Sequence, residues 1–250
     1  MLYSVWMVYR TTNSHIAVII ASCAIVGSSC AAVVAPITAN TQAHNIQGGG
    51  GISSLFDDNE GKITKPDVND PNTWTSAGQS WQDDWQGNGP LNRVDNPTPT
   101  NSKVGWVTFD FGTVVSLDEI FIWNLSEATA QTRRVNTYNI YHSNSPSVAP
   151  VSGSGNNTAS LDYDFASGGW TQLVGTRSLT AYGSGGGAAN GIETIGVSAQ
   201  YIGLEFITYG GEANRVGLNE VVFTEAAAIP EPSTALLGAI GSLMLLRRRR

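Results

Sequence analysis

Alternation of apolar and polar side chains in one short stretch constrains the fold of this 250-residue chain more than any other feature. Residues 105–112 read GWVTFDFG, so three apolar side chains (Val107, Phe109 and Phe111) fall on one face and polar ones on the other. Because successive side chains of a strand point to opposite faces of a sheet, this period of two predicts a strand with one buried face.

Similar runs recur along the chain and are separated by Gly, Asn, Ser and Pro. We expect further strands at residues 117–123, 138–143, 170–174, 191–195, 200–206 and 218–223. No stretch between residues 52 and 224 keeps a helical apolar period for more than two turns. Many short strands with breakers between them predict an all-β fold, an antiparallel β-sandwich.

The charge of this central region excludes some partners. Between Asn40 and Ala228 the chain carries 8 Lys and Arg residues against 19 Asp and Glu residues, a net charge of −11. An acidic surface repels phosphate backbones, so we expect no nucleic-acid binding and favour neutral ligands or divalent cations. Both cysteines, Cys23 and Cys30, precede the region, so it contains no disulfide.

The N-terminal segment is typical of an export signal. Arg10 precedes the apolar run IAVIIASCAIVGSSCAAVVA, which ends in small-residue cleavage options after Ala31 or Ala35. We expect a signal peptide with its helix over residues 1–39, and a flexible linker over the Gly-rich residues 40–51. An uncleaved signal anchor is the alternative, because the run approaches the ~20 residues of a spanning helix.

The C-terminal segment, IPEPSTALLGAIGSLMLLRRRR, predicts a short transmembrane helix. A helix over residues 233–246 would be roughly 21 Å long at about 1.5 Å per residue, shorter than the bilayer core of about 30 Å. The arginines that follow it would stay cytoplasmic under the positive-inside rule. A plain membrane anchor is one interpretation of this segment.

The order of these parts resembles the PEP-CTERM sorting signal, which would occupy residues 225–250. The resemblance implies export through the inner membrane, recognition by an exosortase-type processing enzyme, and release to the cell surface or the exopolysaccharide matrix. Before processing, the protein would be anchored in the membrane. The residues that match the signal are Pro230, Glu231, Pro232, Arg247, Arg248, Arg249 and Arg250.

A second resemblance covers residues 52–224. The succession WVTFDFGTVVSLDEIFIWN, RRVNTYNIYHS, WTQLV, QYIGLEF and GLNEVVF resembles the discoidin or coagulation-factor C-type domain, a galactose-binding-like jelly roll. Most members of that family are non-catalytic binding modules, many of them for carbohydrates.

The same resemblance implies a structural calcium ion, held by a loop near the first strands and by a Glu of the last strand. The matching residues are Asp70, Thr73 and Glu220, and oxygen ligands of this kind suit Ca²⁺. Pro71 stands where the family usually has Gly, and the acidic cluster at residues 57–60 is an alternative ligand set. Solvated acidic turns without an ion are the other interpretation.

A tryptophan-rich stretch from Trp74 to Pro90, WTSAGQSWQDDWQGNGP, suits a sugar site. Indole faces stack on pyranose rings, while carboxylates and amides bind hydroxyl groups. Two indoles could instead fill the open end of the sandwich, and Arg133 could form a structural ion pair. With Glu127 at the same rim, the candidate carbohydrate ligands are Trp81, Asp84, Trp85, Asn124 and Arg133.

The sequence contains no recognisable catalytic motif. His142 is the one histidine after residue 44, and no phosphate-binding loop occurs. The sequence therefore predicts an exported, non-catalytic protein that binds carbohydrate. The alternatives are a structural or adhesive matrix protein without a glycan site, and a glycosidase that uses two of Asp83, Asp84, Glu127 and Glu205.

Overall fold

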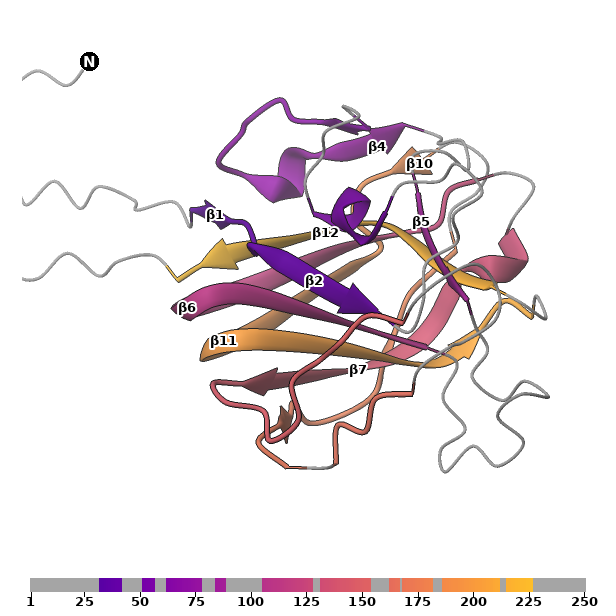
Figure 1. Cartoon of the computed structure of the whole chain (residues 1–250). Coiled ribbons are helices and arrows are strands. Elements are labelled where there is room, and N and C mark those ends of the chain that lie inside the picture. Colours follow the sequence, from indigo (N-terminus) through magenta and orange to yellow (C-terminus); the bar gives the residue numbers. More distant parts are fainter. Residues whose placement is uncertain are drawn as a thin grey trace, which may run out of the picture.

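The computed structural model describes residues 32–41, 51–56, 62–77, 84–88, 105–127, 131–153, 162–166, 168–181, 186–211 and 215–226. They form an all-β antiparallel sandwich, as the strand pattern predicts (Figure 1). Helical structure in these ranges is limited to the 3-10 turns η1 (Ile52–Leu55), η2 (Pro71–Thr73) and η3 (Gln131–Arg133). The strands are β1 (Val33–Val34), β2 (Thr38–Thr41), β3 (Ile63–Thr64), β4 (Thr75–Ala77), β5 (Trp85–Asn88), β6 (Gly105–Asn124), β7 (Val135–Ser143), β8 (Thr171–Gln172), β9 (Arg177–Ser178), β10 (Gly186–Gly187), β11 (Gly191–Tyr209) and β12 (Arg215–Glu225).

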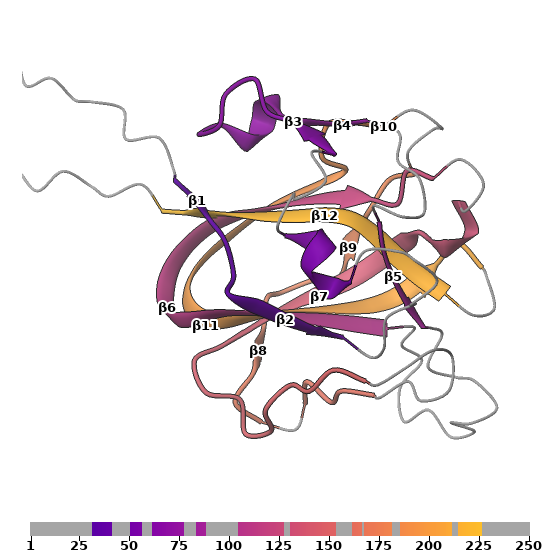
Figure 2. The ribbon, with the colours of Figure 1, turned by 45° about the horizontal axis from the view of Figure 1, so that its top comes forward.

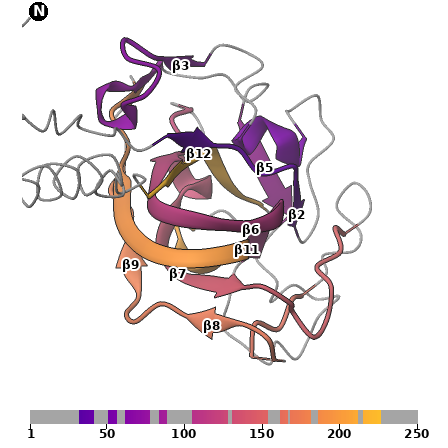
Figure 3. The same cartoon turned by 90° about the vertical axis from the view of Figure 1, so that its left-hand side faces the viewer.

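The main sheet has the strand order β1-β12-β6-β11-β7-β8. Three further strands extend it, because β2 pairs with β6, β5 with β12 and β9 with β7. Figure 3 shows β6, β11, β7 and β8 as successive neighbours. A second, smaller sheet has the order β10-β4-β3.

The long strands β6 and β11 bend and thereby belong to both layers of the sandwich (Figure 2). The first half of β6 pairs with β2 and its second half pairs with β12. At the bend Gly112 has a φ of +73°, which favours glycine, and β11 shifts register between Thr194 and Val197. Such bulges turn a strand from one sheet into the other without ending it. Each of the expected strand pairs, 105–112 with 117–123 and 191–195 with 200–206, is therefore one continuous strand.

The predicted apolar face of residues 105–112 lies in the core. Val107 and Phe109 are 0% exposed, and the rings of Phe109 and Phe111 both contact Phe223 edge-on, with centroids 5.1 Å away. The opposite face is buried too, because Tyr163 and neighbouring aromatic side chains pack over Trp106, which is 2% exposed. The prediction of a single buried face is thus incomplete: a long connection covers the outer face.

The sheet begins ahead of residue 52, the boundary expected from the Gly-rich run. β2 pairs with β6 through residues 38–41, and its side chains of Ala39 and Thr41 are buried. β1 pairs with the end of β12, where the backbone N–H of Glu225 donates to the carbonyl of Ala32 over 2.7 Å. Parts of the segments expected to be signal peptide (1–39) and linker (40–51) therefore occupy sheet positions.

The expected signal and sorting helices cannot be compared with the structure. Residues 1–31 and 227–250 lie outside the described ranges, and with them all the predicted sorting residues. Within the described ranges, no helix has the length and hydropathy that a membrane crossing requires.

Removal of residues 1–41 should destabilise the sandwich more than removal of residues 1–31. The longer deletion takes away β1 and β2 and exposes the backbone of β6 and β12 to water. Each lost hydrogen bond contributes about 0.5–1.5 kcal/mol, so we expect a loss of at least ~2 kcal/mol in the free energy of unfolding. Urea denaturation followed by tryptophan fluorescence measures it, and equal stability of the two truncated chains would contradict a structural role for β1 and β2.

Candidate functional site

Strand β12 connects the two ends of the sandwich. Near its start Val216 pairs with Gly87 of β5, and near its end Thr224 pairs with Val33 of β1. At about 3.3 Å per residue these two pairings lie roughly 26 Å apart. Figure 1 shows β5 and β1 toward opposite ends of the molecule. The described chain ends, residues 32 and 226, therefore lie at the end away from β5.

A polar group lies at the β5 end, and we call it the rim: Gln86 of β5, Glu127 after β6, and Gln131 and Arg133 of η3. Arg133 Nη1 donates to Gln86 Oε1 over 2.9 Å and lies 3.7 Å from Glu127 Oε2. Gln86 Nε2 donates to the same Glu127 oxygen over 3.2 Å. The side chains of Arg133 and Glu127 are 19% and 12% exposed. A partly exposed guanidinium and carboxylate are thus held together with an amide that is itself buried, since Gln86 is 4% exposed.

Asn124, expected to be a sugar ligand at this rim, is 0% exposed. Its Nδ2 donates to the carbonyls of Val135 (2.7 Å) and Thr180 (3.3 Å). Its Oδ1 accepts from the backbone N–H groups of Leu125 (2.9 Å) and Val135 (3.1 Å). Because this amide joins the end of β6 to the start of β7, it positions the segment that carries the rim residues and is not available to a ligand.

Gly217 of β12 allows β5 to approach closely enough to place Gln86. A Cβ at Gly217 would lie 2.8 Å from the carbonyl oxygen of Trp85 and 3.2 Å from Gln86 Cγ. Gln86 pairs directly with Gly217 across the ladder. Gln86 is not among the residues predicted from the sequence, where the stretch around it was considered for its indoles and carboxylates. Alternation within a strand, which turns Gln86 away from the core when Trp85 points into it, was the available signal.

The tryptophan-rich stretch contributes to the core rather than to an open sugar platform. Trp85 is 0% exposed and packs against Phe206, with ring centroids 6.1 Å apart. Trp74 is 3% exposed, and Asp84 has no exposed surface (0%). A fully buried indole presents no ring face to a sugar, so the core interpretation holds for Trp85. Trp81 lies outside the described residues.

The residues expected to hold calcium make other contacts within the protein. Asp70 Oδ1 accepts from the backbone N–H of Asn72 over 3.1 Å and thereby caps η2, and Thr73 Oγ1 donates to the carbonyl of Asp70 over 2.8 Å. Glu220 is buried, with its Oε2 3.1 Å from the ammonium of Lys62. In the described part of the chain, no group of three or more His, Cys, Asp or Glu residues could hold a metal ion. The alternative set at residues 57–60 lies outside the described ranges.

The carboxylates that a glycosidase would need are mostly inaccessible. Glu205 is 1% exposed, and its Oε2 accepts from Tyr141 Oη (2.9 Å) and Asn139 Nδ2 (3.1 Å). Burial, with a contribution from Glu205, raises the pKa of Tyr141 to about 12. Asp84 is buried as well, and Asp83 lies outside the described residues. Only Glu127, of the four carboxylates considered, is described with a side chain that reaches the surface.

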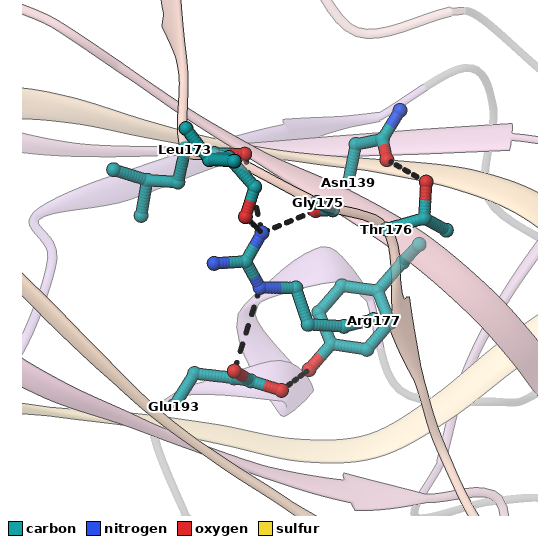
Figure 4. A network of polar contacts seen from close by, with 8 residues as sticks. Asn139, Leu173, Gly175, Thr176, Arg177 and Glu193 are labelled. Carbon is teal, nitrogen blue, oxygen red and sulfur yellow. Dashed lines mark hydrogen bonds and ion pairs between the residues drawn. The ribbon is translucent and has the colours of Figure 1, made fainter.

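A second polar network stabilises the edge of the sheet beside β7 (Figure 4). Arg177 Nε lies 3.4 Å from Glu193 Oε2, and Arg177 Nη1 donates to three backbone carbonyls of the β8–β9 connection, those of Leu173, Val174 and Gly175. Glu193 Oε1 also accepts from Tyr138 Oη over 3.2 Å. Burial, followed by Glu193, raises the pKa of Tyr138 above its ordinary value. Figure 4 shows the connection folded around the guanidinium, which explains how two very short strands stay paired with β7.

Comparisons with known proteins give only distant likenesses. No family model matches the chain, and no curated protein matches it. Among solved structures, an F5/8 type C domain from Bacteroides fragilis has a TM-score of 0.44 at 11% identity, covering 80% of this chain and 99% of that chain. A fucose binding module from Streptococcus pneumoniae has a TM-score of 0.41 at 14% identity, covering 78% of this chain and 96% of that one.

Longer proteins are also among the similar structures. Truncated AlyQ, with CBM32 and alginate lyase domains, has a TM-score of 0.41 at 14% identity. The alignment covers 79% of this chain, which spans about a third (34%) of that one.

Replacement of Trp85 by Ala should destabilise the protein by about 3–5 kcal/mol, the usual cost of deleting a buried indole. Trp85→Phe should cost less than about 2 kcal/mol, because the ring remains and the lost indole N–H has no hydrogen-bond partner in the described ranges. Urea unfolding measures both. If Trp85→Ala kept full stability, Trp85 would not be the core residue that its burial indicates.

The unfolding free energy should fall as the pH rises above about 10. Tyr138 and Tyr141 have a higher pKa in the folded chain than the ordinary 10.0. Their neutral forms therefore stabilise the fold fully below that pH, and this contribution is lost as the pH rises toward the folded values, about 12 for Tyr141. Urea unfolding across the alkaline range should show a shallower fall in Tyr141→Phe. Titration of the native protein, followed by tyrosinate absorbance, is the second measurement. If all tyrosines of the folded chain ionised near pH 10, their ordinary pKa, the prediction would be contradicted.

Proposed function

We propose that the folded part of this chain is a non-catalytic module that binds carbohydrate at the rim, and that the protein is exported to the cell surface or the extracellular matrix. The observation that supports the proposal best is the partly exposed pair of Arg133 and Glu127, held by the buried amide of Gln86, with contacts of 2.9–3.7 Å among the three. Its net charge is zero, which suits a neutral ligand.

Sugars match the chemistry of this cluster. Their neighbouring hydroxyl groups both donate and accept hydrogen bonds, and a guanidinium beside a carboxylate and an amide offers donors and acceptors in a fixed arrangement. The cluster is held in place before a ligand arrives, because β5 is paired with β12 and Asn124 secures the segment after β6. Preorganisation of this kind reduces the entropy lost on binding.

A binding role without catalysis agrees with the carboxylates. Hydrolysis of a glycosidic bond generally needs two carboxyl groups that face the substrate, whereas Glu205 and Asp84 are buried at 1% and 0% exposure. His142 is half-buried, and burial lowers its pKa. Glu205 and Asp84 are thus not accessible to a substrate.

The proposed export follows from the two ends of the sequence. The Pro-Glu-Pro motif at residues 230–232, the apolar run and the terminal arginines would direct the chain across the inner membrane to an exosortase-type enzyme. Because residues 32 and 226 lie at the end of the sandwich away from β5, the rim would face away from the membrane while the tail is attached. After processing, the rim would be open to extracellular polysaccharide or to cell-surface glycans.

A glycan array that includes acidic and neutral bacterial exopolysaccharides tests the proposal. Arg133→Lys keeps the charge but removes the planar fork, so we expect at least a tenfold loss of affinity for the bound glycan, about 1.4 kcal/mol. Arg177→Lys is the matched control, because the side chain of Arg177 is 16% exposed and pairs with a glutamate at the edge of the sheet rather than at the rim.

Two results would contradict the proposal. If the folded wild-type protein bound no glycan on the array, the rim cluster would be a structural ion pair, and the protein would fit the adhesive or structural alternative. If Arg133→Lys and Arg177→Lys lost affinity equally, the sugar site would lie elsewhere.

A further inference from the structure

A lysine side chain is enclosed in the interior of this protein. Lys62 directly precedes β3, and its side chain is 0% exposed. Its ammonium donates to the backbone carbonyl of Ser54 in η1 and to that of Asn219 in β12, the latter over 3.0 Å. It also lies 3.1 Å from Glu220 Oε2. Three oxygen atoms from two separate elements therefore surround one nitrogen.

A lysine ammonium has three N–H donors and no acceptor. Two of these donors bond to the backbone carbonyls of Ser54 and Asn219, and the ammonium forms an ion pair with Glu220. A buried charge is strongly destabilising unless it is paired and hydrogen-bonded. Here Glu220, itself 1% exposed, supplies the opposite charge.

The ammonium lies where three parts of the fold meet. The carbonyl of Lys62 accepts from the backbone N–H of Ala77 over 3.2 Å, which ties the lysine to the small sheet. Asn219 Nδ2 donates to Ser76 Oγ, which ties β12 to the same sheet. Through Ser54 the lysine also holds η1. The ammonium thus joins the main sheet to η1, and the backbone of Lys62 joins both to the small sheet.

One carboxylate and two backbone carbonyls are also ligands that a calcium ion uses. The sequence predicts such an ion with Glu220 as a ligand, yet the carboxylate of Glu220 pairs with Lys62 instead. We propose that the Lys62 ammonium is the structural cation of this fold, supplied by the chain itself in place of a divalent ion, and that shortening this side chain opens a site for a small alkylammonium ion. The proposal is independent of carbohydrate binding.

The first test uses the wild-type protein. Its melting temperature should be the same after dialysis against chelator, in excess CaCl₂, and in NaCl of equal ionic strength. A melting temperature that fell with chelator and returned with Ca²⁺ would overturn the proposal, because the fold would then depend on a divalent ion.

The second test shortens the side chain. Lys62→Ala should lower the melting temperature by about 10 °C, since one partner of a buried pair is lost. Ethylammonium chloride should then raise the melting temperature of Lys62→Ala above its value in the same concentration of NaCl, and leave the wild type unchanged. Lys65→Ala is the control: its ammonium lies 4.6 Å above the Trp74 ring rather than among buried oxygens, and we expect little change. Equal losses in the two variants, or no effect of ethylammonium, would refute the proposed site.

A further test replaces both charged side chains by neutral ones, and it applies even if Lys62→Ala fails to fold. Lys62→Met and Glu220→Gln each leave one buried charge without its partner, whereas the double variant leaves none. The double variant should therefore melt higher than either single variant. If the effects of the two substitutions simply added, Lys62 and Glu220 would not act as a pair, and the proposal would be wrong.

Discussion

Pairing of β6 with strands in both layers is the constraint on which the rest of the structure depends. Its first half forms ladders with β2 and β11, and its second half with β11 and β12. Because one strand runs through both layers, the core between them closes only when β6 and β11 bend together, and Gly112 supplies the positive φ at that bend. All of these partners are distant in sequence, so the fold depends on non-local pairing and we expect it to form slowly.

These strands position the residues of the rim. β6 ends at Asn124, whose buried amide binds the start of β7. Glu127 and Arg133 lie in the connection between these two strands. β12 supplies the edge on which β5 places Gln86. A connection fixed at both ends in this way is more rigid than a free loop, which favours recognition of small hydroxyl patterns.

Three ion pairs among the described residues differ in burial and in position. Lys62 and Glu220 are 0% and 1% exposed, and they hold separate elements together. Arg177 and Glu193, 16% and 25% exposed, close the edge beside β7. Arg133 and Glu127, 19% and 12% exposed, lie at the surface, where an ion pair adds little to stability. The rim pair is about as exposed as the edge pair, and differs from it in lying at the β5 end of the sandwich.

The sequence by itself determined the all-β class, because the period of two in segments such as residues 105–112 is typical of a strand whatever its partners are. Local pattern could not show that residues 105–124 form one bent strand or that residues 38–41 join it, since both depend on pairing with remote strands. Dependence on remote partners also explains why most of the candidate site could not be predicted from the sequence. Arg133 was predicted from its place before a strand, but only the tertiary structure decided that Trp85 is core, that Gln86 stands beside Arg133, and that the partner of Glu220 is a lysine.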